Sequence, residues 1–128
     1  MYRLPLAALT FVALAMPAWA QDAELGEKSF RKCTPCHDVG PEAQTKLGPV
    51  LNGLEGRKSG TIKGYTYTEA NKNSGLTWDE TTFKDYITDP KAKIPQTKMI
   101  FAGIKNEKER ADLWAYLKQF GPDGKPKK

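Results

Sequence analysis

Hydrophobic and polar positions divide most of the chain into short helical segments separated by long loops. Residues 22–32 place two large apolar side chains among charges and predict a short helix, and residues 68–73 predict one or two helical turns. Residues 77–88 and 106–120 repeat apolar side chains at helical spacing along one face. No segment alternates apolar and polar residues over a useful length, so the pattern predicts an all-α fold.

Capping residues set the predicted bounds of the two longer helices. Thr77, with Glu80 three residues later, forms a capping-box pattern and predicts a helix that begins after Thr77. Pro90 ends that helix near Thr88, because the residue before a proline disfavours the helical region. The last helix begins at a similar pattern at Asn106 and runs to about position 120.

Two long segments lack helical periodicity and are predicted to be loops. Residues 40–64 hold six of the eleven glycines and two prolines, and residues 89–104 show no clear period. A loop as long as residues 40–64 is uncommon in a small domain, so we expect it to wrap around a bound group. The last four residues, 125–128, are basic apart from one proline and are expected to form a solvated tail.

The N-terminal segment has the pattern of a secretory signal peptide. Arg3 precedes an apolar run over residues 4–16, and Ala-Trp-Ala at residues 18–20 fits a cleavage site. We expect cleavage after Ala20, which leaves residues 21–128 as a single domain in an oxidising compartment such as a bacterial periplasm. The run is shorter than the roughly 20 apolar residues that span a bilayer. The alternative is a retained N-terminal anchor.

The charge balance is modest. Arg3 is the only charged residue among the first 20, so residues 21–128 carry 19 basic and 15 acidic side chains, a formal charge of +4. No basic run is interleaved with aromatic residues, the pattern typical of nucleic-acid binding. We therefore expect neither nucleic-acid binding nor stable membrane insertion by residues 21–128.

The pentapeptide at residues 33–37, Cys-Thr-Pro-Cys-His, holds both cysteines and the only histidine of the chain. Two thiols at this spacing can each add to a vinyl group of a haem, and the adjacent imidazole can bind the iron. The pentapeptide therefore predicts one covalent haem c attached through Cys33 and Cys36, with His37 as an axial ligand.

Other interpretations of a CxxC pair fit less well. A thioredoxin-like dithiol expects a βαβ context, which the pattern lacks. A zinc site needs four ligands, and the chain supplies only two thiols and one imidazole before carboxylates are considered. A disulfide between Cys33 and Cys36 would close a very short loop and stabilise little. None of these requires His37 directly after Cys36.

Met99 is the best candidate for a second iron ligand. Electron-transfer haems commonly take a second histidine or a methionine, and Met1 and Met16 belong to the segment expected to be removed. A thioether raises the reduction potential, and two filled axial positions leave no place for dioxygen or peroxide. We predict a single-electron carrier. The alternative, with a lysine or a vacant sixth site, includes a haem peroxidase or a gas-binding protein.

Beyond these residues the chain resembles the class I c-type cytochromes, small monohaem electron carriers. The likeness follows the family's order and spacing in residues 26–30, 46–53, 64–71, 76–78, 94–104 and 110–117. The resemblance implies a monomer with the cytochrome c fold, in which the first and last helices cross. It places Gly26, Phe30, Leu113 and Tyr116 at that crossing.

The resemblance also implies roles for residues around the haem. The carbonyl of Pro49 should accept a hydrogen bond from the second ring nitrogen of His37. Tyr67 and Trp78, with Arg57 nearby, should hold a haem propionate.

Further roles fall in the loop that carries Met99. Asn71, Tyr86 and Thr97 should form a polar cluster beside Met99. Gln96 stands where the family commonly has glycine. If this position requires a positive φ, its side chain strains the loop.

Lysines near the haem-bearing segments are expected to ring the exposed haem edge and to steer the carrier toward acidic patches on larger redox proteins. The family's partners include quinol–cytochrome c oxidoreductase, terminal oxidases, reaction centres, dehydrogenases, reductases and peroxidases, bound transiently. The expected lysines are Lys28, Lys32, Lys46, Lys91, Lys93, Lys98 and Lys105.

Overall fold

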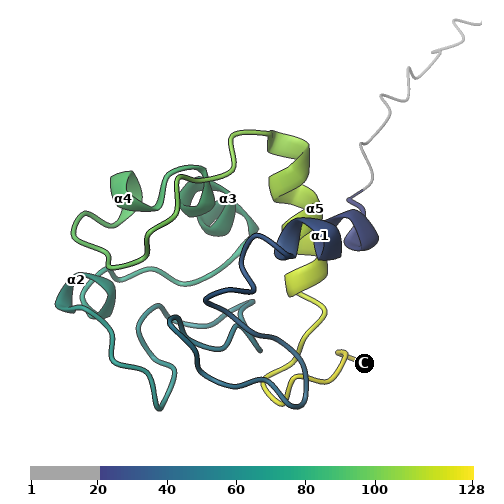
Figure 1. Ribbon diagram of the computed structural model, residues 1–128, viewed down its shortest axis with the longest axis horizontal. Helices are drawn as coiled ribbons and strands as arrows, with labels where there is room; N and C mark the ends of the chain where they lie inside the picture. The colour runs from purple at the N-terminus through teal and green to yellow at the C-terminus, as the bar shows by residue number, and fades with distance from the viewer. Residues whose placement is uncertain (1–20) are drawn as a thin grey trace, which may run out of the picture.

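A computed structural model describes residues 21–128, and the expected signal segment, 1–20, lies outside these residues. Figure 1 shows short helices joined by long loops. The helices are α1 (Ala23–Phe30), α2 (Glu69–Lys72), α3 (Glu80–Thr88), α4 (Pro90–Lys93) and α5 (Glu107–Leu117). Residues 21–128 contain no β-strand, only two isolated bridges. The all-α prediction is confirmed.

Helices α1 and α5 cross at close range (Figure 1). Gly26 of α1 lies so near the backbone of α5 that a Cβ atom there would come within 1.9 Å of the carbonyl oxygen of Asp112. Phe30 and Tyr116 pack beside this contact with ring centroids 5.5 Å apart, and Leu113 is completely buried. The predicted crossing is confirmed. Its closeness depends on the missing side chain at Gly26.

Helix α3 begins two residues later than its capping pattern predicts. The N-cap is Asp79, whose carboxylate accepts the backbone N–H of Thr82 at 2.7 Å. Thr77 forms an isolated bridge with Lys58 instead. Since Trp78 also donates its backbone N–H to Arg57 at 2.9 Å, the chain stays extended up to Asp79.

Helix α4 is absent from the sequence prediction, which treats residues 89–104 as a loop throughout. Pro90 ends α3 as expected but also occupies the first position of α4, where proline is well tolerated. Asp89 caps this short helix through the backbone N–H of Ala92 at 3.3 Å. The remainder of the segment is non-helical.

The predicted end of the last helix, near position 120, is also corrected. Helix α5 ends at Leu117. Phe120 forms an isolated β-bridge with Pro126, and its carbonyl accepts a hydrogen bond from the N–H of Gly53 at 3.1 Å. These contacts with distant residues draw the chain away from the helix axis.

The buried core lies between the helices and the long loops. Within residues 21–128, no helix is long and apolar enough to cross a membrane. Phe83 of α3 packs on Trp114 of α5 with ring centroids 5.2 Å apart. The buried apolar cluster comprises Phe30, Leu54, Trp78, Phe83, Tyr86, Ile87, Ile94, Ile104, Leu113, Trp114 and Leu117. Several of these side chains also face a large cavity, around which the loop of residues 40–64 folds as predicted.

Candidate functional site

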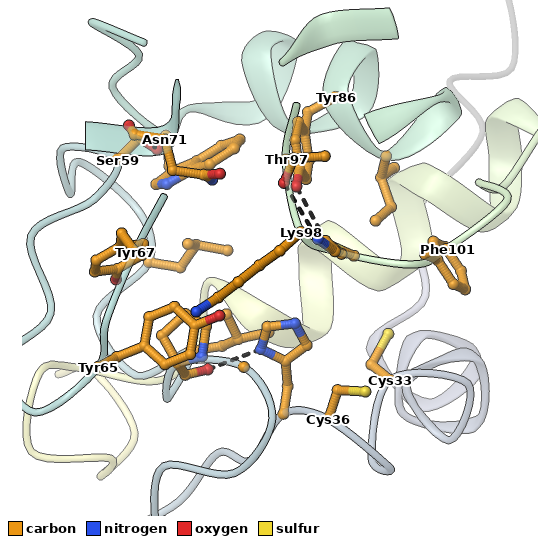
Figure 2. A pocket seen from close by; sticks show the side chains of 18 of the residues that line it. Cys33, Cys36, Ser59, Tyr65, Tyr67, Asn71, Tyr86, Thr97, Lys98 and Phe101 are labelled. Atoms are coloured by element: carbon orange, nitrogen blue, oxygen red, sulfur yellow. Dashed lines mark hydrogen bonds between the residues drawn. The ribbon is translucent and has the colours of Figure 1, made fainter. Parts of the chain in front are cut away.

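A cavity of about 510 Å³ opens into the core (Figure 2). Protein interiors are close-packed and rarely leave voids much larger than a water molecule. A mostly apolar cavity of this size is typical of a cofactor site. All of the cofactor-binding residues expected from the sequence line it, namely Cys33, Cys36, His37, Pro49, Arg57, Tyr67, Asn71, Trp78, Tyr86, Thr97 and Met99.

The backbone after α1 turns so that both cysteines face the cavity. The N–H groups of Cys36 and His37 both donate to the carbonyl of Cys33, at 3.0 and 2.8 Å. The two thiols are not joined in a disulfide, and Figure 2 shows their sulfur atoms on the same side of the cavity. Burial raises the pKa of the Cys33 thiol to about 11, although Lys32 opposes the shift. A neutral thiol is a poor metal ligand and a poor redox nucleophile.

His37 is held with one ring nitrogen engaged and the other available. Its Nδ1 donates to the carbonyl of Pro49 at 2.8 Å, which leaves Nε2 with its lone pair. Gly48 lies flush against the ring, where a Cβ atom would come within 2.4 Å of Cε1. Burial lowers the pKa of His37, partly opposed by the Pro49 hydrogen bond. The imidazole is therefore neutral at pH 7 and fixed in orientation.

Met99 is held by polar contacts to two side chains. Tyr86 donates its hydroxyl hydrogen to the Met99 sulfur at 3.1 Å, and the Met99 N–H donates to the Thr97 hydroxyl at 3.4 Å. Burial raises the pKa of the Tyr86 phenol, so it stays protonated at neutral pH, although hydrogen bonding with Thr97 partly opposes the shift.

Asn71 lies apart from this cluster. Its side-chain oxygen accepts the hydroxyl of Thr68 at 2.9 Å, and Thr68 is the N-cap of α2. Asn71 therefore shares the cavity wall with Tyr86 and Thr97 but forms no hydrogen bond with them or with Met99 among residues 21–128.

Arg57 brings a positive charge to the cavity wall. Its guanidinium donates to the carbonyls of Val50 and Asn52 at 3.0 and 2.9 Å and forms no ion pair with any residue in 21–128. Burial lowers the pKa of Arg57, while neighbouring Tyr67 raises it. A half-buried cation without a counter-ion among residues 21–128 fits a ligand that carries carboxylates.

Tyr67 and Trp78 complete this part of the wall. The Tyr67 hydroxyl accepts the backbone N–H of Ile62 at 3.2 Å, and Trp78 packs edge-on against Tyr86 with centroids 5.0 Å apart. Arg57, Tyr67 and Trp78 all line the same cavity, so the three residues expected around a propionate do share one site.

Gln96, in the loop before Met99, has φ +70° and is the one non-glycine residue with positive φ among residues 21–128. A positive φ is the condition under which the sequence predicts strain at Gln96, where the class I c-type cytochromes commonly have glycine. A residue with a Cβ atom is strained there, by about 1–2 kcal/mol for an L-residue in the left-handed region.

The rim of the cavity carries apolar side chains that the sequence does not single out. Leu47 is 75% exposed and Ile100 is 91% exposed, and both line the opening. Apolar residues next to lysines in two loops give no periodic signal, so the sequence cannot separate them from core residues. Lys98 lies at the same rim with its ammonium 4.4 Å from the Tyr65 ring centroid (Figure 2).

The donor set fits haem attachment better than a bare metal ion. Residues 21–128 contain no cluster of three or more His, Cys, Asp or Glu side chains that could hold a metal ion. The cavity is instead large and mostly apolar, with two thiols, one imidazole, one thioether and one half-buried guanidinium in its wall. A planar macrocycle that bears vinyl groups, carboxylates and a central iron matches each of these groups.

Relatives of known identity resemble nearly the whole described chain. A family model described as cytochrome c matches residues 23–121. A cytochrome c2 of Rhodoplanes tepidamans is 73% identical over 107 residues, which covers 84% of this chain and all of that protein. The cytochrome c2 of Blastochloris viridis is 57% identical over 127 residues, covering 99% of this chain and all of its own. The structure of cytochrome cH from Methylobacterium extorquens matches with a TM-score of 0.72 at 45% identity, covering 77% of this chain and 98% of its own.

Proposed function

Because the chain belongs to the cytochrome c family, we propose that it is a periplasmic electron shuttle in which His37 and Met99 bind the iron of one haem c. It is an electron-transfer protein and not an enzyme, and its haem is attached through Cys33 and Cys36. The haem supplies an iron that accepts and releases one electron.

One observation carries the ligand assignment. The cavity wall contains every cysteine, histidine and methionine found in residues 21–128, which are Cys33, Cys36, His37 and Met99. Cys33, Cys36 and His37 lie within five residues of one another, so the informative member of the set is Met99, which reaches the same cavity wall from the loop after α4. Core packing alone would not require them to share a wall.

The surrounding residues tune the two axial ligands. The Pro49 carbonyl makes the His37 imidazole a stronger donor, because the hydrogen bond increases the basicity of the ring. The Tyr86 hydroxyl withdraws electron density from the Met99 sulfur, which favours ferrous iron. Thr97 holds the backbone of Met99.

Arg57, Tyr67 and Trp78 would neutralise and enclose a haem propionate, since a carboxylate would supply the counter-ion that Arg57 lacks among residues 21–128. Asn71 lines the same cavity and bonds to Thr68 instead of Met99, so it would contact the haem directly.

The sixth ligand is tested by absorption and magnetic circular dichroism spectra of the oxidised holoprotein. Wild-type protein should show a sulfur-to-iron charge-transfer band at neutral pH, and Met99→Ala should lose it. Ile100→Ala, which shortens the exposed neighbour of Met99, should keep it. A wild-type spectrum without the band would overturn the assignment and favour a lysine ligand or an open sixth site. The pyridine haemochrome of wild-type protein checks that two thioethers attach the haem.

Partner binding is proposed to use the seven lysines that lie near the haem-bearing segments in sequence, of which Lys32 and Lys98 line the cavity. All seven expected lysines are exposed. Lys32 and Lys93 pair with Glu109 and Asp85, so the other five carry most of the uncompensated charge. Lys46 directly precedes the exposed Leu47, and Lys98 precedes the exposed Ile100 by two residues. Leu47, Lys98 and Ile100 line the same cavity, so its wall combines exposed apolar side chains with positive charge. Such a surface suits brief contact with an acidic redox partner.

The rim is tested by the ionic-strength dependence of electron transfer to the terminal oxidase of the source organism. Lys46→Gln should slow the second-order rate at low salt and flatten its salt dependence. Lys125→Gln, which removes an exposed lysine outside the cavity, should leave both nearly unchanged. Equal effects of the two variants would contradict the proposal.

Export is proposed from the N-terminal pattern, with cleavage after Ala20. Mass spectrometry of the protein from the periplasmic fraction should give the mass of residues 21–128 plus one haem. A haem-bearing species that still contains Met1 would instead indicate a membrane-tethered cytochrome.

A further inference from the structure

The C-terminal residues 125–128 are exposed, as the sequence predicts, but they are bound to the rest of the fold and do not form a free tail. The N–H of Gly121 donates to the carbonyl of Lys125 at 2.8 Å, and the N–H of Lys127 donates to the carbonyl of Gln119 at 2.9 Å. Residues 119–127, here called the C-terminal turn, are thus closed on themselves. The Lys127 ammonium also pairs with Glu55 at 2.9 Å. The turn lies beside the loop of residues 40–53, yellow against blue in Figure 1.

The C-terminal turn touches that loop at two points. Gly124 is buried with φ +77°, and a Cβ atom there would come within 2.0 Å of the carbonyl oxygen of Gly40. At the second point, Phe120 accepts the N–H of Gly53 at 3.1 Å, and Pro122 lies 2.9 Å from where a Gly53 Cβ would be. Both contacts are backbone to backbone and leave no room for adjustment by side chains.

The two contact points are joined by one side chain. Asn52 accepts the N–H of Gly40 and donates to its carbonyl, each at 2.9 Å. Gly53, the second contact point, follows Asn52 directly. The C-terminal turn therefore contacts Gly40 and Gly53, the residue that follows its hydrogen-bond partner Asn52.

From Asn52 the pairing continues toward the haem ligand. The N–H of Leu51 donates to the carbonyl of Asp38 at 3.0 Å, and the N–H of Gly48 donates to the carbonyl of Cys36 at 2.8 Å. Residues 48–52 are thereby fixed beside residues 36–40. Pro49, whose carbonyl accepts the hydrogen bond from His37, lies within this paired stretch.

We propose that the C-terminal turn is a positioning element that holds the Pro49 carbonyl against the His37 ring by locking the Gly40–Asn52 end of this paired stretch. The family match ends at residue 121, so most of the turn lies beyond it. The inference rests on the proposed function only where His37 is taken as an iron ligand. The hydrogen bond and its support belong to the protein itself.

The test compares two glycine-to-alanine variants of the holoprotein. Gly124→Ala places a methyl group against Gly40. Gly75→Ala imposes a similar left-handed strain, with φ +70°, but its methyl group meets no atom within 4 Å. NMR of the reduced protein should show the His37 ring N–H exchanging roughly tenfold faster in Gly124→Ala than in Gly75→Ala, because overpacking weakens the lock. The reduction potential should also rise, since a ring without its acceptor is a weaker donor.

Equal exchange rates and equal potentials in the two variants would overturn the proposal. A changed potential with an unchanged ring N–H would overturn it too, because the effect would then not pass through His37. Either result would leave the Met99 band of the ligand test intact, so failure of this inference is distinguishable from failure of the proposed function.

Wild-type protein supplies a second test that does not depend on a variant folding. Amide hydrogen exchange in low denaturant should show the N–H groups of Gly53 and Gly124 opening in the same transition as those of Gly48 and Leu51. If Gly48 and Leu51 keep full protection while Gly53 and Gly124 exchange, the C-terminal turn does not hold the paired stretch.

Discussion

The hydroxyl of Tyr86 donates a hydrogen bond to the sulfur of Met99 across 3.1 Å. Tyr86 belongs to α3 and Met99 to the loop after α4, so the contact joins a rigid helix to a segment without regular structure. In the proposed holoprotein, the same sulfur gives its other lone pair to iron. The strength of that second bond then depends on α3.

Tyr86→Phe should lower the reduction potential. Loss of the hydrogen bond returns electron density to the Met99 sulfur, which stabilises ferric iron. A hydrogen bond contributes a net free energy of about 1 kcal/mol, and a change of that size in the stability of one oxidation state shifts a one-electron reduction potential by roughly 40 mV. Spectroelectrochemical titration measures the change. Tyr116→Phe removes the same atom at the α1–α5 crossing and should leave the potential within a few millivolts, whereas equal shifts would contradict the argument.

The Gln96→Gly substitution should lower the unfolding free energy only slightly or raise it. Glycine relieves the left-handed strain at φ +70° but loses more conformational entropy on folding. Gln44→Gly supplies the control, since Gln44 is an exposed loop residue without positive φ and should show only the entropic loss. Guanidinium unfolding of the two holoproteins should give Gln96→Gly an unfolding free energy about 1 kcal/mol higher than that of Gln44→Gly. Identical losses would mean that the loop accommodates Gln96 without strain.

Gly26→Ala should destabilise the protein even though alanine is the better helix former. The new Cβ would lie 1.9 Å from the carbonyl oxygen of Asp112, so α1 and α5 must separate. Overpacking of this kind costs about 1–3 kcal/mol. Glu27→Ala, at the exposed neighbouring position of α1, should change the unfolding free energy by less than about 0.5 kcal/mol. Denaturant unfolding monitored by far-UV circular dichroism measures both.

Glu109 should make stability depend on acid pH. Hydrogen bonds from Lys32 and then Ser29 lower the pKa of Glu109 below its ordinary value of 4.5. Because the folded pKa is the lower one, this stabilisation is fully present above pH 4.5 and is lost as the pH falls through the folded value.

The measurement for Glu109 is the unfolding free energy from pH 7 to pH 3. Wild-type protein should exceed Glu109→Gln by on the order of 0.5 kcal/mol at pH 7, and the difference should shrink as the pH falls below 4.5. Glu42→Gln, at an exposed loop carboxylate outside every ion pair among residues 21–128, serves as the control variant. A wild-type advantage that is undiminished at pH 3 would rule out the ionised carboxylate as its source.

Local sequence determined the cofactor residues and most of the helices. Attachment of a haem needs Cys33, Cys36 and His37 at a fixed short spacing, and such a spacing is legible without a fold. Asn106 was identified as a cap because capping is a contact between residues three apart, and its side chain does accept the N–H of Glu109 at 2.9 Å. The pattern of residues 77–88 likewise revealed α3, but tertiary pairing of Thr77 with Lys58 moved its start to Asp79.

The family resemblance implied some distant contacts, such as the crossing of α1 and α5, but others were decided only by the tertiary structure. Gly124 and Gly40 are far apart in the chain, and nothing in the sequence shows that their backbones touch. The same holds for the exposure of Leu47 and Ile100 at one rim. Spacing along the chain specifies contacts made within a turn of helix or a short loop. Contacts that close long loops depend on the folding of every segment between them, so the sequence predicted the ligands while the fold determined which residues surround them.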